Sequence, residues 1–215
     1  MRQSELIHNI YNALELGNEA IEAYRPAGYS WYETAKVQTQ LFADAMGVTP
    51  EIAALVLAGA SRATSVWQSF ARSEIYLRTG TVYFAGDYID SLLERYRMVG
   101  KFGSATSPKV SAFCRNILDG DSDTLTVDRH AISLAVGKKV EGASNTLLAK
   151  LRRAYCVVSR DTGLPQSEVQ SIAWIGWRSI DSRFQFHAAE HGRHHADVFA
   201  DFTPMDYLES TGCYA

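Results

Sequence analysis

Apolar side chains recur every three or four positions along most of the chain, and this spacing is the period of an amphipathic helix. The pattern is clear between residues 4 and 24, where Leu6, Ile10 and Leu14 would share one face. Similar patterns predict further helices over residues 31–46, 52–60, 64–77, 88–99, 147–158 and 166–180. No pair of strands is predicted, so the expected fold class is all-α.

Signals for helix starts and ends separate these segments. Ser30-Trp31-Tyr32-Glu33 is a capping box, and Thr49-Pro50 places a proline at a first helical position. Asp87 is the predicted cap of the helix over residues 88–99, and Gly100 would end that helix. These signals fix helix boundaries before any chemistry is considered.

Two further helix starts lie between residues 101 and 136, and both carry candidate chemistry. At the first, Ser107 is a good N-cap and Pro108 suits the first helical position, so Lys109 would project from the first turn. The positive end of a helix dipole disfavours a charged lysine. Lys109 is therefore predicted to be a better amine nucleophile than an ordinary surface lysine.

The second start is at Asp128, nineteen residues after Lys109 and directly after a short extended segment, Thr124–Val127. Asp128 is the predicted N-cap of a helix over residues 129–136, and its carboxylate would accept backbone N–H bonds that favour the charged form. A carboxylate fixed in this way can stabilise a developing cation. Such a cation forms at C1′ of a sugar when a glycosidic bond breaks.

The net charge of −3 argues against a nucleic-acid partner, but the charges are unevenly distributed along the chain. Residues 101–160 contain 10 basic and 5 acidic side chains, a net charge of +5, whereas residues 1–100 and 161–215 have net charges of −3 and −5. The positive block coincides with the two helix starts and suits a surface that contacts phosphate. The same excess is also compatible with an ordinary solvated surface.

The chain resembles the helix-hairpin-helix DNA glycosylase superfamily in the segments Ser107–Ala112 and Thr126–His130. The Gln-x-x-x-Trp pattern formed by Gln170 and Trp174 resembles a phage-encoded branch of glycosylase-like proteins. The resemblance implies one two-lobed domain over residues 1–215, with lobes of roughly 1–86 plus 140–215 and of 87–139. It also implies that Asp128 is the catalytic carboxylate and that Lys109 corresponds to the lysine that forms a Schiff base in bifunctional members. DNA would be the partner, and a flipped base the leaving group.

The hairpin differs from the glycine-rich Leu-Pro-Gly-x-Gly form of that superfamily, because residues 102–107 contain one glycine. Hydroxyl groups would therefore replace backbone contacts to phosphate. The predicted DNA-binding residues are Ser104, Thr106, Ser107, Arg129, Lys138 and Lys139.

Two clusters toward the C-terminus have alternative interpretations. Gln170 and Trp174 would share one helix face and could line a base pocket, or they could be a core tryptophan and an amide satisfied within the protein. Four histidines, interrupted by Gly192, have a spacing that could bind a metal on a helix, but no further ligand completes the set. No metal and no cofactor are predicted from this cluster, which consists of His187, His191, His194 and His195.

The three cysteines are scattered, and the sequence has neither a signal peptide nor an apolar run long enough to span a membrane. We therefore expect a cytoplasmic, monomeric protein with no membrane contact. Three functions fit these features: a DNA glycosylase, an enzyme that hypermodifies thymine in phage DNA, and a DNA-binding module without chemistry. A purely structural helical domain could also contain both helix starts by chance.

Overall fold

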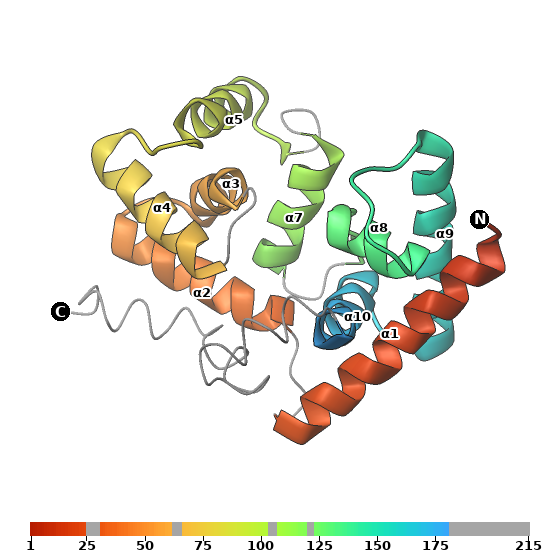
Figure 1. Ribbon diagram of the computed structural model, residues 1–215. Helices are drawn as coiled ribbons and strands as arrows, with labels where there is room; N and C mark the ends of the chain where they lie inside the picture. Colours follow the sequence, from red (N-terminus) through yellow and green to blue (C-terminus); the bar gives the residue numbers. More distant parts are fainter. Residues whose placement is uncertain (25–30, 62–65, 103–106, 120–122, 181–215) are drawn as a thin grey trace. The chain divides into compact units, whose positions relative to one another are not determined.

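The computed structural model describes residues 1–24, 31–61, 66–102, 107–119 and 123–180 of the chain. Within these ranges the protein is all-α, as predicted, with nine helices and no strand. Figure 1 shows their course. The helices are α1 (Gln3–Tyr24), α2 (Trp31–Met46), α3 (Pro50–Ala60), α4 (Val66–Thr79), α5 (Gly86–Val99), α7 (Pro108–Asp119), α8 (Arg129–Val136), α9 (Asn145–Thr162) and α10 (Gln166–Ile180).

Several of the predicted helix ends are confirmed, whereas the predicted cap Ser30 lies outside the described residues. The Thr49 hydroxyl accepts a hydrogen bond from the Ile52 N–H at 3.4 Å and caps α3. Gly100 ends α5 in the left-handed conformation, with φ of 68°. Two predictions were wrong in detail. Asp87 lies inside the first turn of α5, whose N-cap is Ala85, and α9 begins before Leu147 because the Ser144 hydroxyl caps it.

The helices group into two compact units. One unit contains Met1–Tyr32 and the chain from Asp121 through α10, and the other contains Glu33–Gly120. These boundaries differ from those of the predicted lobes, which were placed after residues 86 and 139. The difference arises because α1, at the start of the chain, packs against α8, α9 and α10, so the N-terminal segment and the C-terminal helices form one core.

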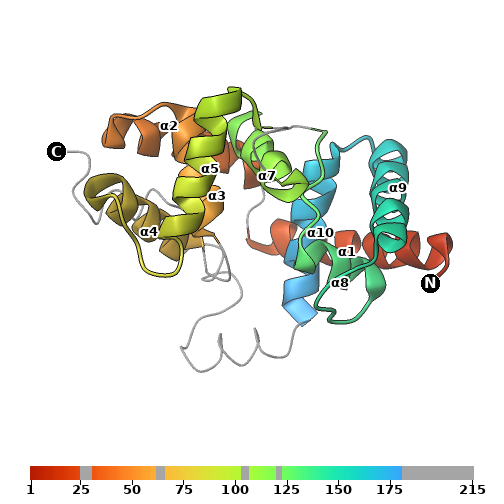
Figure 2. The same ribbon diagram turned by 90° about the horizontal axis from the view of Figure 1, so that it is seen from above.

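In the first unit, α1 packs most extensively on α10, and Figure 2 shows α1, α8, α9 and α10 from above. Two glycines permit this close approach. A methyl group on Gly17 would overlap the carbonyl oxygen of Ile172, and one on Gly176 would overlap the carbonyl oxygen of Ala13. The core around this contact is apolar and includes Leu6, Ile10, Leu134, Leu151, Tyr155 and Val158, all almost completely buried.

In the second unit, α3 is the central helix and packs against α4, α5 and α7. Eight consecutive residues of α3, Ala53 to Ala60, are buried, which agrees with the small apolar character predicted for this segment. The Cys114 thiol of α7 donates to the Ala54 carbonyl at 3.6 Å, and burial raises the pKa of this thiol to about 12. In the described ranges no single helix has the length and hydropathy of a membrane span, although the bent pair Ala35–Met46 and Pro50–Ala60 meets both criteria together.

Candidate active site at the start of α8

Asp128 caps α8 as predicted. Its backbone is extended, with φ of −103° and ψ of −179°, and its Oδ1 accepts a hydrogen bond from the Ala131 N–H at 2.7 Å. The Asp128 carbonyl accepts from the Ile132 N–H at 3.1 Å, so the turn of helix that follows is closed. The side chain is half-buried. The carboxylate is thus fixed through one oxygen, and its second oxygen has no hydrogen-bond partner within the described ranges.

The segment that leads to Asp128 is held by Gln170 of α10. The Thr126 N–H donates to Oε1 of Gln170 at 3.0 Å, and Nε2 of Gln170 donates to the Thr126 carbonyl at 2.6 Å. Both residues are buried, and a buried backbone group without such a partner would be costly. These bonds agree with the interpretation in which the Gln170 amide is satisfied within the protein. Gln170 therefore positions the backbone two residues before Asp128.

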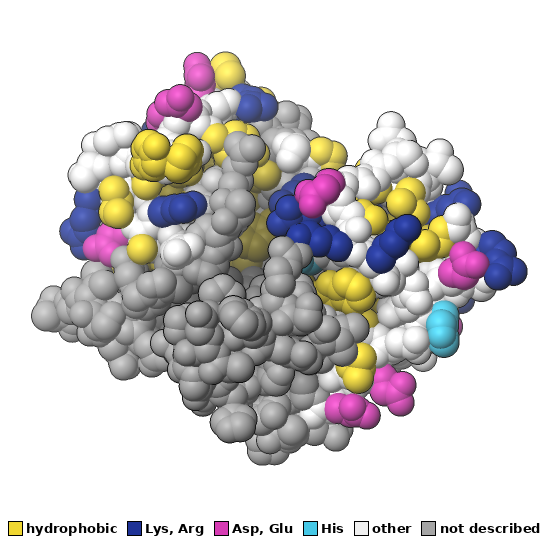
Figure 3. Space-filling view, in the orientation of Figure 1, with side chains coloured by type: hydrophobic (Ala, Val, Ile, Leu, Met, Phe, Trp, Pro, Cys, Tyr) yellow, Lys and Arg dark blue, Asp and Glu magenta, His cyan; other side chains and the backbone are white. Residues whose placement is uncertain are grey.

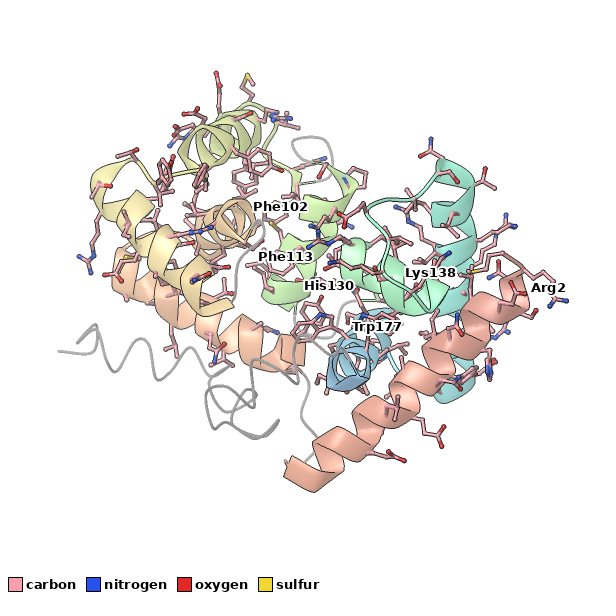
Figure 4. All side chains as sticks on the ribbon, in the orientation of Figure 1. Arg2, Phe102, Phe113, His130, Lys138 and Trp177 are labelled. Carbon is pink, nitrogen blue, oxygen red and sulfur yellow. The ribbon has the colours of Figure 1, made fainter. Side chains whose placement is uncertain are left out.

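Aromatic rings flank the start of α8. The His130 ring and the Trp174 ring of α10 meet edge to face, with centroids 6.4 Å apart and an interplanar angle of 78°. Both side chains are half-buried. Trp177, one turn further along α10, packs against the core of this unit, and Figure 4 labels it together with His130. Trp174 can thus contribute an aromatic surface near the carboxylate, whereas Trp177 is part of the core.

Tyr155 of α9 lies in the same core, among residues on both sides of Asp128 in the sequence. It is fully buried and belongs to the cluster that includes Ala131 and Ile132, with Val127 packed against it. Burial and then the charge of Asp128 raise the pKa of Tyr155 well above its ordinary value. Nothing in the sequence singles out Tyr155, because its position on the apolar face of a helix gives no sign that the charge of Asp128 acts on its hydroxyl.

Basic side chains lie at both ends of α8. Arg129 forms an exposed ion pair with Glu141 at 3.3 Å, while Lys138 and Lys139 are exposed in the loop after the helix. This loop is tied back because the Val140 N–H donates to the Ser133 hydroxyl at 3.1 Å. Figure 3 shows Lys and Arg side chains over α8 and α9, with a few carboxylates among them. Three of the predicted DNA-binding residues, Arg129, Lys138 and Lys139, are thus exposed in this unit.

The remaining predicted site residues belong to the other unit or lie outside the described residues. Ser107 caps α7, because its hydroxyl accepts from the Val110 N–H at 3.4 Å, and Lys109 is exposed in the first turn of this helix. Lys109 and Asp128 therefore belong to different units. Ser104, Thr106 and the histidines at positions 187, 191, 194 and 195 lie outside the residues that the structure describes.

Within the described ranges, no group of three or more His, Cys, Asp or Glu side chains is arranged to hold a metal ion. The fold and this site together describe an all-helical protein. Its candidate site is a half-buried carboxylate at a helix N-cap, with an aromatic pair and basic side chains nearby. Residues 2–181 match the model of a family of unknown function, DUF7178, and the chain belongs to this family. No curated protein and no solved structure matches the chain.

Proposed function

We propose that the protein is a DNA glycosylase-type enzyme that cleaves the bond between a flipped base and its sugar, with Asp128 as the catalytic carboxylate. The observation that carries this proposal is the geometry of Asp128. One carboxylate oxygen is fixed by the Ala131 N–H at 2.7 Å, and the other remains available in a half-buried position. A charge held in place before the reaction stabilises a developing cation more effectively than a mobile one.

The chemistry follows from this arrangement. The bond between C1′ and the base nitrogen breaks, and its electron pair leaves with the base, so positive charge develops at C1′. Asp128 stabilises that charge. A water oxygen then bonds to C1′, and the proton that the water loses passes to the carboxylate. Trp174 supplies an aromatic surface on which an extruded base can stack.

Binding of the duplex would use the basic side chains around α8. Lys138 and Lys139 are exposed and have no ion-pair partner within the described ranges, whereas Arg129 would have to exchange Glu141 for phosphate. Each such contact makes binding more dependent on salt. Removal of one lysine should therefore lower the salt slope of DNA binding by about one charge. The resemblance of the segments Ser107–Ala112 and Thr126–His130 to helix-hairpin-helix glycosylases supports the same partner.

Asp128→Asn tests the proposal directly. Asparagine is a good N-cap, so the variant should fold and bind DNA normally, while base release falls on the order of a hundredfold or more because the charge is lost. Release would be measured as alkali-labile breaks in duplexes that each contain one damaged or modified base, modified thymines included. Asp87→Asn is the matched control, because it makes the same change in the first turn of α5.

Each outcome has a definite meaning. Equal base release by wild type and Asp128→Asn would exclude this mechanism. DNA binding by both proteins, with no base release from any duplex in the panel, would favour a DNA-binding module. A change in the mass of the modified base without its release would instead favour the DNA-modification enzyme.

A further inference from the structure

An exposed pair of aromatic rings lies in the connection between α4 and α5. Tyr83 and Phe84 are 79% and 81% exposed, and their ring centroids lie 3.9 Å apart with an interplanar angle of 53°. Figure 3 shows hydrophobic side chains between α4 and α5. Large apolar side chains that are exposed next to one another mark interaction surfaces, whereas isolated ones do not. This pair belongs to the second unit, and the proposed reaction has no use for it.

The backbone holds both rings out in a fixed turn, residues 82–85, which we call the aromatic turn. The Val82 carbonyl accepts hydrogen bonds from the N–H groups of Ala85 at 3.4 Å and Gly86 at 2.9 Å, directly before α5. Ala85 is buried and anchors the turn on the core of its unit. Phe84 has φ of 63°, a conformation that bulky residues rarely adopt. Strain of this kind is concentrated at functional sites, so the aromatic turn is a candidate for one.

The charges around the aromatic turn indicate what it can bind. Residues 80–94 contain three carboxylates, all exposed, and no basic side chain. The basic side chains on either side of this segment are engaged within the protein. Arg78 pairs with Glu74 at 2.8 Å, and Arg95 donates to the carbonyl and the hydroxyl of Ser91 at 3.1 and 2.6 Å. The surface next to the two rings is therefore negative, which repels a nucleic-acid phosphate and attracts a cation.

A cationic side chain suits both features of this surface. The faces of tyrosine and phenylalanine rings attract cations, and a guanidinium group can stack on a ring while it forms ion pairs with carboxylates. We propose that the aromatic turn is a docking surface for a basic, arginine-containing segment of a partner polypeptide. An arginine of that segment stacks on the rings of Tyr83 and Phe84, and its other basic side chains pair with the carboxylates of residues 80–94. This surface lies in the second unit and does not rest on the proposed function.

A titration with a defined peptide tests this docking surface. The probe is a short, fluorescently labelled peptide of Arg-Gly repeats, and a peptide of Glu-Gly repeats is the charge-reversed control. The full chain should bind the Arg-Gly peptide in fluorescence anisotropy, with an affinity that falls as salt is added, and should not bind the Glu-Gly peptide. The backbone amide NMR signals that the Arg-Gly peptide shifts most should be those of residues 82–94.

Variants of the two rings separate docking from general attraction of a basic peptide. Phe84→Asn should weaken binding about threefold, and the double variant Tyr83→Asn with Phe84→Asn about tenfold, because each ring contributes a cation–π contact. Asparagine tolerates a positive φ, so Phe84→Asn keeps the turn, and circular dichroism would verify that it folds. Val37→Asn is the matched control, because it removes a 56% exposed apolar side chain from α2 in the same unit and should leave binding unchanged.

Several outcomes would overturn the proposal. Equal binding of the Arg-Gly peptide by the wild type and the double variant would do so, as would NMR shifts centred on another surface. Self-association of the wild type that Phe84→Asn abolishes, without binding of the peptide, would show that a second copy of the chain is the occupant. Shifts of residues 82–94 by duplex DNA would assign the rings to nucleic acid instead. None of these measurements uses base release, so the proposed function and the docking surface can fail separately.

Discussion

The starts of α7 and α8 were predicted by the same kind of signal, yet the structure gives them different environments. Ser107 caps α7 and Asp128 caps α8, each through a hydrogen bond to a backbone N–H of the first turn. Lys109 in the first turn of α7 is exposed, whereas Asp128 is half-buried above the core of its unit. A capping signal therefore determines where a helix begins. The packing around that helix start determines whether a side chain there is exposed to solvent or held in a partly buried site.

The two units also differ in how much of their apolar surface they bury. In the first unit, the glycines of α1 and α10 bring two backbones into contact over a continuous core. In the second, large apolar side chains remain exposed between α4 and α5 and at the end of α5, with exposed fractions of 79% for Tyr83, 81% for Phe84 and 71% for Met98. The first unit is thus expected to be the more sensitive to added volume.

The largest expected effect comes from Gly176→Ala. A methyl group at this position would overlap the Ala13 carbonyl oxygen and approach the Gly17 N–H nitrogen at 2.6 Å, and backbone atoms cannot move aside as a side chain can. We expect the free energy of unfolding to fall by about 3 kcal/mol. Urea denaturation followed by circular dichroism would measure the loss.

Two glycine variants sharpen this comparison between the units. Gly59→Ala in α3 would bring a methyl group to 2.6 Å from Cγ1 of Ile89, a side-chain atom that can shift, so a smaller loss of about 1–2 kcal/mol is expected. Gly142→Ala has no atom within 4 Å of the new methyl group and should change little. If Gly59→Ala costs as much as Gly176→Ala, the contact between α1 and α10 is not the tighter one.

The next effect concerns the bonds that position the start of α8. Gln170→Met keeps the length of the side chain but leaves the buried N–H and carbonyl of Thr126 without their partners. The free energy of unfolding should fall by about 2 kcal/mol. Gln40→Met, at an exposed position on α2, is the control and should stay within about 0.5 kcal/mol of wild type. A neutral Gln170→Met would mean that water replaces the amide.

Much of the secondary structure was predictable from the sequence, because helix period and capping are local properties. α10 was predicted with its observed bounds, as was α8 with its cap. The error at α5 has a local cause. Asp87 has the right chemistry for a cap, but the N-cap is Ala85, two residues earlier, where the N–H groups of Ala85 and Gly86 donate to the Val82 carbonyl at 3.4 and 2.9 Å.

The grouping of the helices and the partners of Asp128 could not be predicted in the same way. Both depend on contacts between residues far apart in the chain, such as Gly17 with Ile172, or Thr126 with Gln170. Gln170 illustrates the problem, because one spacing of polar and aromatic residues fitted both a base pocket and a satisfied amide. The predicted relation of Lys109 to Asp128 stays a prediction, since these residues belong to different units.

Lys109→Gln tests whether the exposed lysine of α7 reacts or only binds. If Lys109 attacks C1′, borohydride should trap the wild-type protein on an abasic duplex as a covalent crosslink, because the amine forms an imine that borohydride reduces. Lys109→Gln should abolish this crosslink. If Lys109 only contacts phosphate, no crosslink forms in wild type, and the variant lowers the salt slope of DNA binding by about one charge.

Lys101→Gln is the matched control, because Lys101 is also exposed and lies in the same unit. A crosslink that survives in Lys109→Gln but is lost in Lys101→Gln would show that the reactive amine is Lys101 and not Lys109. Equal salt slopes for wild type and Lys109→Gln, with no crosslink, would remove Lys109 from the DNA-binding surface altogether.

The smallest expected effect has the opposite sign and lies in the second unit. Phe84 has φ of 63°, and no other non-glycine residue of the described ranges has a positive φ. A bulky side chain is strained in this conformation, whereas asparagine tolerates it. Because Phe84 is 81% exposed, Phe84→Asn should lose little packing and raise the free energy of unfolding by about 0.5–1 kcal/mol.

Thermal unfolding would measure this gain, with Tyr83→Asn as the control, since Tyr83 has no positive φ to relieve. A loss of stability in Phe84→Asn would show that the contact between the Tyr83 and Phe84 rings, with centroids 3.9 Å apart, outweighs the backbone strain.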